Sequence, residues 1–193
     1  MPQDSPQRPD AGGALDALLE LLALDDLPRT GWLLRGVRSP ESVAGHILGV
    51  GYVALALAPR VDPPLDLARV LAMALVHDAP EARSGDLPQP AARHLPAGAK
   101  AGMEGAIAED LLGALSTVAH GGFAEYEAQE SREARFVKAC DRLHLGVRLV
   151  GYERAGTRGL GEFWSTLEAG RFDEFAPCAE LARTLRAARE GPR

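Results

Sequence analysis

The sequence predicts an all-α protein built as a single helical bundle of about six or seven helices. Apolar residues recur at intervals of three or four positions along most of the chain, which is typical of amphipathic helices. No stretch alternates apolar and polar residues as a half-buried strand does, and no repeat of fixed length occurs. The length of 193 residues is that of one ordinary domain. We therefore expect residues 14–193 to form one domain after a flexible tail, 1–13.

Composition limits the classes of function. Hydrophobic residues make up 46 % of the chain and charged residues 25 %, which is typical of a soluble globular protein. The net charge of −6 argues against a nucleic-acid polymer as partner. Two cysteines, Cys140 and Cys178, are expected to be buried thiols in a reducing cytoplasm. We find no signal peptide and no apolar run near membrane-spanning length, so we expect a cytoplasmic protein without a membrane partner.

The first two helices are expected on either side of an irregular segment. The first covers about 14–24, and the second runs from the Ser39-Pro40 pair to about residue 58. Serine is a favoured N-cap and proline a favoured first helical residue, which places the start of the second helix. His46 lies on the apolar face of this helix, where a histidine is either a satisfied core residue or a ligand.

The irregular segment 27–38 carries three arginines around Trp32. An aromatic plate beside guanidinium groups can hold a flat ring and an anion. An exposed basic loop whose tryptophan fills the core would give the same pattern, because tryptophan is usually well buried. The three arginines are Arg29, Arg35 and Arg38.

The third helix ends in the densest group of reactive side chains in the chain. Asp66 is placed to cap its start, and Pro80 disfavours helical backbone before it, so the helix should end or kink there. His77 and Asp78 then fall in its last turn, and Glu81 follows directly. An ionised carboxylate at the end of an apolar helix is costly unless it is paired or bound to a metal ion.

The remaining helices carry one more polar exception. They are expected over 99–119, from Ser131 past residue 150, over 160–169 and over 177–189. Asp141 lies on the apolar face of the helix that Ser131 opens, where it is hard to explain as a surface charge. Three other histidines, His94, His120 and His144, are expected to be surface or structural residues. Phe163, Trp164, Phe172 and Phe175 either pack internally or form a dimer surface.

Three apolar helix faces thus carry polar exceptions: His46, then His77 with Asp78, then Asp141. Each has a structural explanation by itself. Together they provide two imidazoles and two carboxylates, a mixed nitrogen and oxygen donor set for a divalent ion. Such an ion would offset the charge that burial makes costly.

The order of these residues resembles the HD-domain metal-dependent phosphohydrolase superfamily. Five segments place the resemblance in its 5′-deoxynucleotidase branch, that of the YfbR-type and HD-domain-containing protein 2-type enzymes. The segments are Arg29-Thr30-Gly31-Trp32, Arg38 to His46, Leu75 to Glu81, Gly85-Asp86-Leu87-Pro88 and Phe136 to Asp141. They extend from about residue 27 to about residue 153, over most of the chain.

The resemblance implies hydrolysis of deoxyribonucleoside 5′-monophosphates to deoxyribonucleoside and phosphate with one divalent ion, which could be Mn, Co, Mg, Fe, Ni or Zn. It implies His46, His77, Asp78 and Asp141 as metal ligands. It implies Asp78 and Glu81 as catalytic residues, the first orienting metal-activated water and the second protonating the leaving oxygen. The implied substrate contacts are Trp32, Arg29, Arg35, Arg38, Asp86, Leu87, Pro88 and Gln89.

One position departs from the pattern of the bacterial members, in which an arginine directly precedes the tryptophan. This chain has Gly31 there, so one of the three loop arginines is expected to hold the phosphate. The resemblance also implies a homodimer. Two alternatives stay open: an HD phosphohydrolase acting on another nucleotide or phosphorylated metabolite, and a non-catalytic nucleotide-binding HD module.

Overall fold

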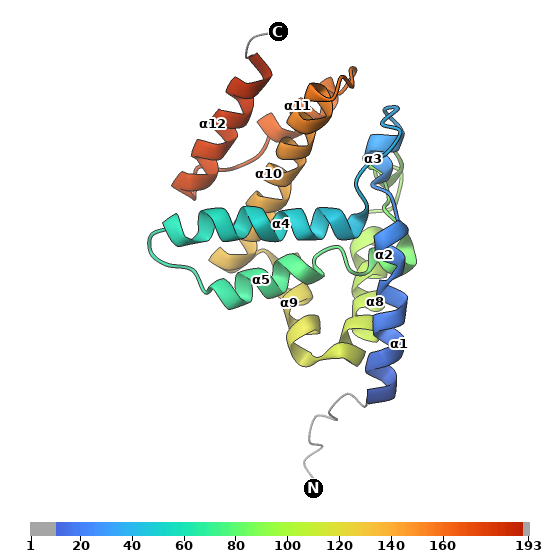
Figure 1. The fold of residues 1–193 in the computed structure, drawn as a ribbon. Helices are drawn as coiled ribbons and strands as arrows, with labels where there is room; N and C mark the ends of the chain where they lie inside the picture. The colour runs from blue at the N-terminus through green and yellow to red at the C-terminus, as the bar shows by residue number, and fades with distance from the viewer. Residues whose placement is uncertain (1–10, 191–193) are drawn as a thin grey trace, which may run out of the picture.

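The computed structural model describes residues 11–190 and confirms the all-α class (Figure 1). In this range eight helices have eight or more residues, rather than the six or seven expected. They are α1 (Ala11–Leu21), α4 (Val43–Leu57), α5 (Leu67–Val76), α8 (Ala99–Leu115), α9 (Thr117–Ala128), α10 (Arg132–Arg154), α11 (Gly161–Glu168) and α12 (Ala176–Glu190). The described part contains no strand, only an isolated antiparallel bridge between Pro28 and Ser42.

Short helical turns connect these helices. They are α2 (Ala23–Asp26), α3 (Thr30–Leu33), the 3-10 turn η1 (Ala58–Arg60), α6 (Glu81–Ser84) and α7 (Gln89–Ala92). Most of the expected tail, 1–13, lies outside the described residues, and its last three positions belong to α1.

Helix α4 crosses the middle of the molecule and α10, the longest helix, packs against it. In Figure 1, α11 and α12 lie on one side of α4, and α1, α5, α8 and α9 lie on the other. Because α10 contacts α4, α5, α9, α11 and α12, it joins the two sides. The largest apolar cluster follows these contacts and includes Val50, Val70, Phe136, Leu143 and Trp164.

The segment formed by α4 and η1, Val43–Arg60, is long and apolar enough by composition to cross a membrane. The expectation that no apolar run approaches that length is therefore wrong. In the structure α4 packs against α5 and α10 and buries Val50, Ala54 and Leu57. The segment is a core helix of a soluble protein.

Side-chain capping sets where the helices begin. Asp66 caps α5 and Ser131 caps α10, as the sequence predicted. The expected start of α4 near Pro40 is wrong, because Ser42 is the N-cap and its hydroxyl accepts a hydrogen bond from the Gly45 amide at 3.1 Å. The residues just before Ser42 are therefore not helical, and their backbone can form hydrogen bonds with the start of the loop that precedes α4.

The expected helix over 99–119 is in fact two helices, divided at Ser116. The backbone of Ser116 is extended, with φ −175° and ψ 160°. Its hydroxyl accepts a hydrogen bond from the Ala119 amide at 3.1 Å, so it begins α9 as an N-cap. The division lets α9 turn back and pack against both α8 and α5.

The aromatic residues near the C-terminus pack internally. Trp164, Phe172 and Phe175 are buried, and Phe163 lies over Trp32 with ring centroids 4.1 Å apart. The alternative of a dimer surface made by these rings is therefore wrong. Both cysteines are buried and free, as expected.

Candidate active site

His77 lies at the end of α5, and one of its two ring nitrogens can bind a cation. The Nδ1 atom of His77 lies 2.8 Å from the carbonyl oxygen of Ala74, so the hydrogen on this nitrogen is donated to the backbone. The other nitrogen, Nε2, lies 3.4 Å from His46 Nε2 and 3.5 Å from Asp78 Oδ2. Nε2 of His77 can therefore accept a cation.

Two further helices supply the other donors. His46 comes from α4 and Asp141 from α10, and His46 Nε2 lies 3.2 Å from Asp141 Oδ1. His46 Nε2 is also 3.6 Å from Asp78 Oδ2. Ligands bound about 2.1 Å from one ion stand about 3.0–3.4 Å apart, so these donors have the spacing and the chemistry of one divalent site. The structure thus contains a candidate metal site that includes His46, His77 and Asp78.

Both carboxylates of this group are held ionised. Burial alone would raise the pKa of Asp78, but the charges of His77 and Arg29 outweigh it and the pKa is lowered. Burial of Asp141 is likewise outweighed, by its hydrogen bond to His46 and by the charge of Lys138, so its pKa lies well below the ordinary value. The Lys138 ammonium is 3.2 Å from Asp141 Oδ2.

Arg29 reaches this site because the start of the loop before α4 is hydrogen-bonded to the end of the same loop. The Arg29 amide donates to the Glu41 carbonyl oxygen at 3.0 Å. Its Nη1 lies 3.1 Å from Asp78 Oδ2 and 3.5 Å from Asp86 Oδ1. Burial disfavours the charged guanidinium, but the neighbouring carboxylates outweigh it and raise the pKa of Arg29, which therefore stays cationic.

Glu81 has the opposite electrostatic character. It begins α6 one turn after Asp78 and is 4 % exposed. Among the described residues, its Oε2 atom is a buried oxygen without a hydrogen-bond partner. Burial, followed by the charges of Asp78 and Asp86, raises the pKa of Glu81 to about 9. At neutral pH Glu81 is therefore a carboxylic acid that can donate a proton.

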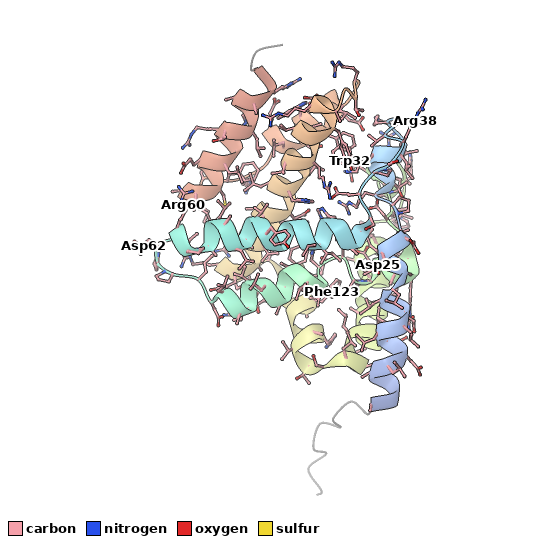
Figure 2. All side chains as sticks on the ribbon, in the orientation of Figure 1. Asp25, Trp32, Arg38, Arg60, Asp62 and Phe123 are labelled. Atoms are coloured by element: carbon pink, nitrogen blue, oxygen red, sulfur yellow. The ribbon has the colours of Figure 1, made fainter. Side chains whose placement is uncertain are left out.

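A cavity of about 450 Å³ opens beside these groups. Most of the sequence-predicted residues line it: Arg29, Trp32, Arg35, Asp78, Glu81, Asp86, Leu87, Pro88, Gln89 and Asp141. His46 and His77 are buried behind its wall. Arg38 does not line the cavity, because it is exposed at the outer tip of its loop (Figure 2).

Trp32 fills the core as well as lining the cavity. It is only 2 % exposed, and its ring packs on Phe163 and Tyr152. The core-filling alternative is therefore correct for most of the ring. The amide of Thr30, which precedes Trp32 by two residues, donates a short hydrogen bond to Asp86, which fixes that carboxylate at the mouth of the cavity.

Three cationic residues of the cavity, Lys100, Lys138 and Arg142, were not predicted from the sequence. Lys100 is held by Glu104, one turn further along α8, at 2.7 Å. In the sequence of a single helix such residues cannot be told from ordinary surface charges. Only the packing of α8 and α10 around the cavity identifies them.

His144, which was predicted to be a surface or structural residue, lies behind His46, and Glu41 lies behind His144. His144 is buried, and its Nδ1 lies 3.0 Å from His46 Nδ1. Burial, followed by the charges of His46 and Arg148, lowers the pKa of His144 to about 3. His144 follows Asp141 by three residues, so both side chains lie on one face of α10. This spacing is the sequence signal that could have identified His144 as part of the site.

Comparisons with known proteins agree with this geometry. A family model described as the HD domain matches residues 23–176. The 5′-deoxynucleotidase HDDC2 of Xenopus laevis is 33 % identical to this chain over 168 residues, which cover 84 % of this chain and 81 % of the relative.

Solved structures share the fold. A protein of Pyrococcus horikoshii has a TM-score of 0.76 and 30 % identity, with 90 % of this chain and 97 % of that chain covered. A protein of Magnetospirillum magnetotacticum, described as a predicted metal-dependent phosphohydrolase, has a TM-score of 0.62 and 26 % identity, with 93 % and 90 % covered. By its sequence and its fold, this chain belongs to the HD-domain family.

Proposed function

We propose that this chain is a metal-dependent 5′-deoxynucleotidase, which hydrolyses deoxyribonucleoside 5′-monophosphates to deoxyribonucleoside and phosphate. One observation carries the proposal. Four nitrogen and oxygen donors, from α4, from α10 and from the end of α5 with the turn that follows it, converge at the wall of a cavity that Glu81 and Arg29 also line. The name of the Xenopus relative supports the substrate class.

The proposed metal ligands are the two imidazole Nε2 atoms of His46 and His77 and one oxygen each from Asp78 and Asp141. When bound, a divalent cation makes water nucleophilic at neutral pH and polarises a phosphoryl oxygen. The mixed donor set accepts Mn, Co, Mg, Fe, Ni or Zn. Asp78 is proposed to orient the attacking water as well, because its carboxylate faces both the donors and the cavity.

Glu81 is proposed as the general acid. Its pKa of about 9 means that it holds a proton at neutral pH, which the leaving 5′ oxygen needs when the bond to phosphorus breaks. Glu81 lines the cavity, and its buried Oε2 atom has no hydrogen-bond partner among the described residues.

The cationic side chains of the cavity are proposed to hold the phosphate. Arg29 is the nearest to the donor set, and Lys138, Lys100 and Arg142 come from the facing helices. Fixed positive charges at these positions would balance the charge that develops on the phosphate oxygens. Arg35 takes part at the rim, where it pairs with Glu162.

The sugar and base are proposed to lie against the remaining wall. Asp86 is placed to accept a hydrogen bond from a sugar hydroxyl, while Leu87, Pro88 and Gln89 form the adjacent surface with Trp32. The volume of about 450 Å³ falls in the range of small-molecule sites.

The experiment that tests this function measures phosphate release from nucleoside mono- and triphosphates, ribo and deoxy, with Mn²⁺, Co²⁺ or Mg²⁺. The wild-type protein is run beside Asp78→Asn and Glu81→Gln. Both substitutions should lower kcat by about 100-fold or more. Asp25→Asn is the matched control, because Asp25 is exposed on α2 and should leave turnover unchanged.

The outcomes separate the alternatives. Turnover of deoxyribonucleoside monophosphates alone supports the proposal. Turnover confined to triphosphates or other phosphate esters contradicts the substrate and retains the HD chemistry. A folded protein that binds the ion but turns over no substrate would instead be a nucleotide-binding module.

We also propose that residues 14–193 act as one domain, in the cytoplasm and as a homodimer. Leu48 and Tyr52 on α4 are 55 % and 63 % exposed, and large exposed apolar side chains that lie together are typical of interaction surfaces. Sedimentation equilibrium of the purified protein tests the dimer.

A further inference from the structure

His46 has two ring nitrogens with different surroundings. Its Nε2 faces the donors His77 and Asp141, and its Nδ1 lies 3.0 Å from Nδ1 of His144. A neutral imidazole carries one hydrogen, and a nitrogen that binds a cation carries none. With a cation at Nε2, the hydrogen of His46 is on Nδ1 and must be donated to His144.

This requirement fixes the tautomer of His144. If its Nδ1 accepts, its own hydrogen is on Nε2, which faces Oε2 of Glu41 at 3.8 Å. The distance is longer than a hydrogen bond, so Glu41 acts on this N–H as a negative charge. Glu41 is fixed in turn by Arg148, whose Nε lies 2.7 Å from Oε2, and by Trp32, whose Nε1 donates to Oε1 at 3.2 Å.

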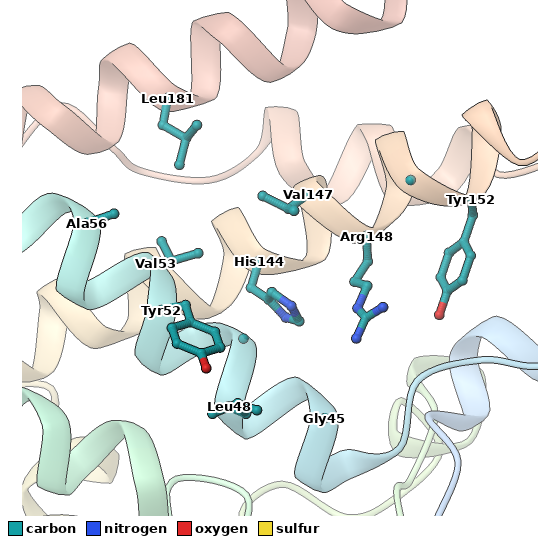
Figure 3. A pocket seen from close by; sticks show the side chains of 12 residues that line it. Gly45, Leu48, Tyr52, Val53, Ala56, His144, Val147, Arg148, Tyr152 and Leu181 are labelled. Carbon is teal, nitrogen blue, oxygen red and sulfur yellow. The ribbon is translucent and has the colours of Figure 1, made fainter.

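The fold reserves space for the His144 ring. A Cβ atom at Gly49 would lie 1.9 Å from Nε2 of His144, so any other residue at position 49 would displace the imidazole. Figure 3 shows His144 and Arg148 pointing from α10 toward α4, His144 beside the apolar pocket and Arg148 toward Gly45. At Gly51, half a turn further along α4, a Cβ atom would meet nothing within 4 Å.

We propose that His144 is a positioning residue that holds His46 in the tautomer and orientation needed to bind the cation, with Glu41 behind it. The inference rests on the metal site of the proposed function. Metal-ligating histidines usually donate their second nitrogen to a carboxylate or a carbonyl oxygen. Here an imidazole takes that place, and the carboxylate stands one residue further from the metal.

The test compares two substitutions whose side chains have the same branched shape, His144→Asn and His144→Leu. The Asn side chain can place an oxygen near the position of Nδ1 and accept the His46 hydrogen, whereas Leu cannot. The Kd for Mn²⁺ is measured by electron paramagnetic resonance on the purified full chain. We expect His144→Leu to weaken Mn²⁺ binding by about 10- to 100-fold and His144→Asn by less than about threefold.

A second pair changes the ring position without changing His144. Gly49→Ala should weaken Mn²⁺ binding, because the methyl group displaces the imidazole, whereas Gly51→Ala should bind like the wild type. Thermal unfolding of each variant shows that it is folded before its Kd is compared.

Nitrogen-15 NMR of the histidine rings in the Zn²⁺-loaded wild-type protein tests the tautomer without any substitution. We expect His144 to carry its hydrogen on Nε2; a hydrogen on Nδ1 would overturn the inference. Equal Mn²⁺ affinity of His144→Leu and wild type would also overturn it, as would equal losses in His144→Asn and His144→Leu. Failure of the wild type to bind Mn²⁺ would contradict the metal site itself. Binding without turnover would contradict only the proposed reaction.

Discussion

Glu81 and Arg29 show how the same neighbours produce opposite results in two side chains. Their closest atoms, Oε2 and Nη1, lie 3.9 Å apart, and both residues face Asp78 and Asp86. Burial disfavours the charged form of both side chains, and the two carboxylates stabilise the positive charge of Arg29 while they oppose a negative charge on Glu81. The site therefore holds a permanent cation and a proton donor in contact.

The raised pKa of Glu81 predicts a pH dependence of stability in the metal-free protein. A carboxyl group whose pKa rises on folding binds more protons when folded, so stability falls as pH rises between the two values. For Glu81 this interval runs from the ordinary 4.5 to about 9. Urea unfolding in the presence of a chelator, at several pH values, should show a smaller decline in Glu81→Gln than in the wild type. An equal decline in both would contradict the raised pKa.

Substitution of two arginines in the same loop separates the residue that lines the cavity from the one that does not. Arg29→Gln removes the charge nearest the donor set and should raise KM about tenfold or more, since charge-assisted contacts contribute about 1.5–3 kcal/mol. Arg38→Gln changes an exposed side chain at the loop tip and should leave KM unchanged. Steady-state kinetics with a deoxyribonucleoside monophosphate gives both values. Equal effects in the two variants would contradict this placement of the phosphate.

Single residues were predictable from the sequence where an apolar pattern was interrupted. His46, Asp78 and Asp141 stand out because each is a polar residue in an apolar helix face. Glu41 and Lys100 do not stand out, because their neighbours in sequence are ordinary. Their importance arises from helices that contact each other only in the folded chain, and no local sequence pattern predicts those contacts.

At the scale of elements, the type of each long helix was predictable and its ends were less so. The cap Asp66 was found because a strong apolar run follows it, and the cap Ser131 because Glu133 falls in the first turn of the helix that it opens. Ser116 was missed because apolar residues continue with helical spacing on both sides of it. A hydroxyl within a continuous apolar pattern can cap a new helix, and only its backbone conformation tells the two cases apart.

The N-cap hydrogen bond of Ser116 should make a measurable contribution to the free energy of unfolding. Ser116→Ala removes the N-cap of α9 and should lower the free energy of unfolding by about 1 kcal/mol. Ser165→Ala, on the exposed face of α11, should change it by less than about 0.5 kcal/mol. Urea unfolding monitored by circular dichroism measures both. A loss of the same size at both positions would mean that the cap contributes nothing specific.

At the scale of the whole molecule, the sequence predicted an all-α domain from periodicity, and the arrangement of its helices came only from the structure. The segment that is apolar enough to cross a membrane shows why the arrangement could not be predicted. Val43–Arg60 is that segment by composition, yet α4 has α5 on one side and α10 on another. Which faces of an apolar helix are covered depends on segments far away in the chain.

The buried cysteines provide a test of the global packing. Cys140 on α10 and Cys178 on α12 are both fully buried, and burial, followed by the neighbouring Cys178, raises the pKa of Cys140 well above its ordinary value. A thiol-specific reagent such as DTNB should react with neither thiol in the native protein and with both after denaturation. Rapid labelling of a native thiol would mean that α12 opens away from α10.

The bridge between Pro28 and Ser42 closes residues 29–41 into a loop whose two ends are held together by the amides of Arg29 and Val43. The loop lies at the mouth of the cavity, while the helices behind it carry the candidate metal ligands. The loop therefore has two tasks, because Arg29 faces the cavity while Trp32 and Glu41 pack into the helical frame. A redesign of substrate choice in this loop should keep Trp32 and Glu41 and vary the exposed residues between them.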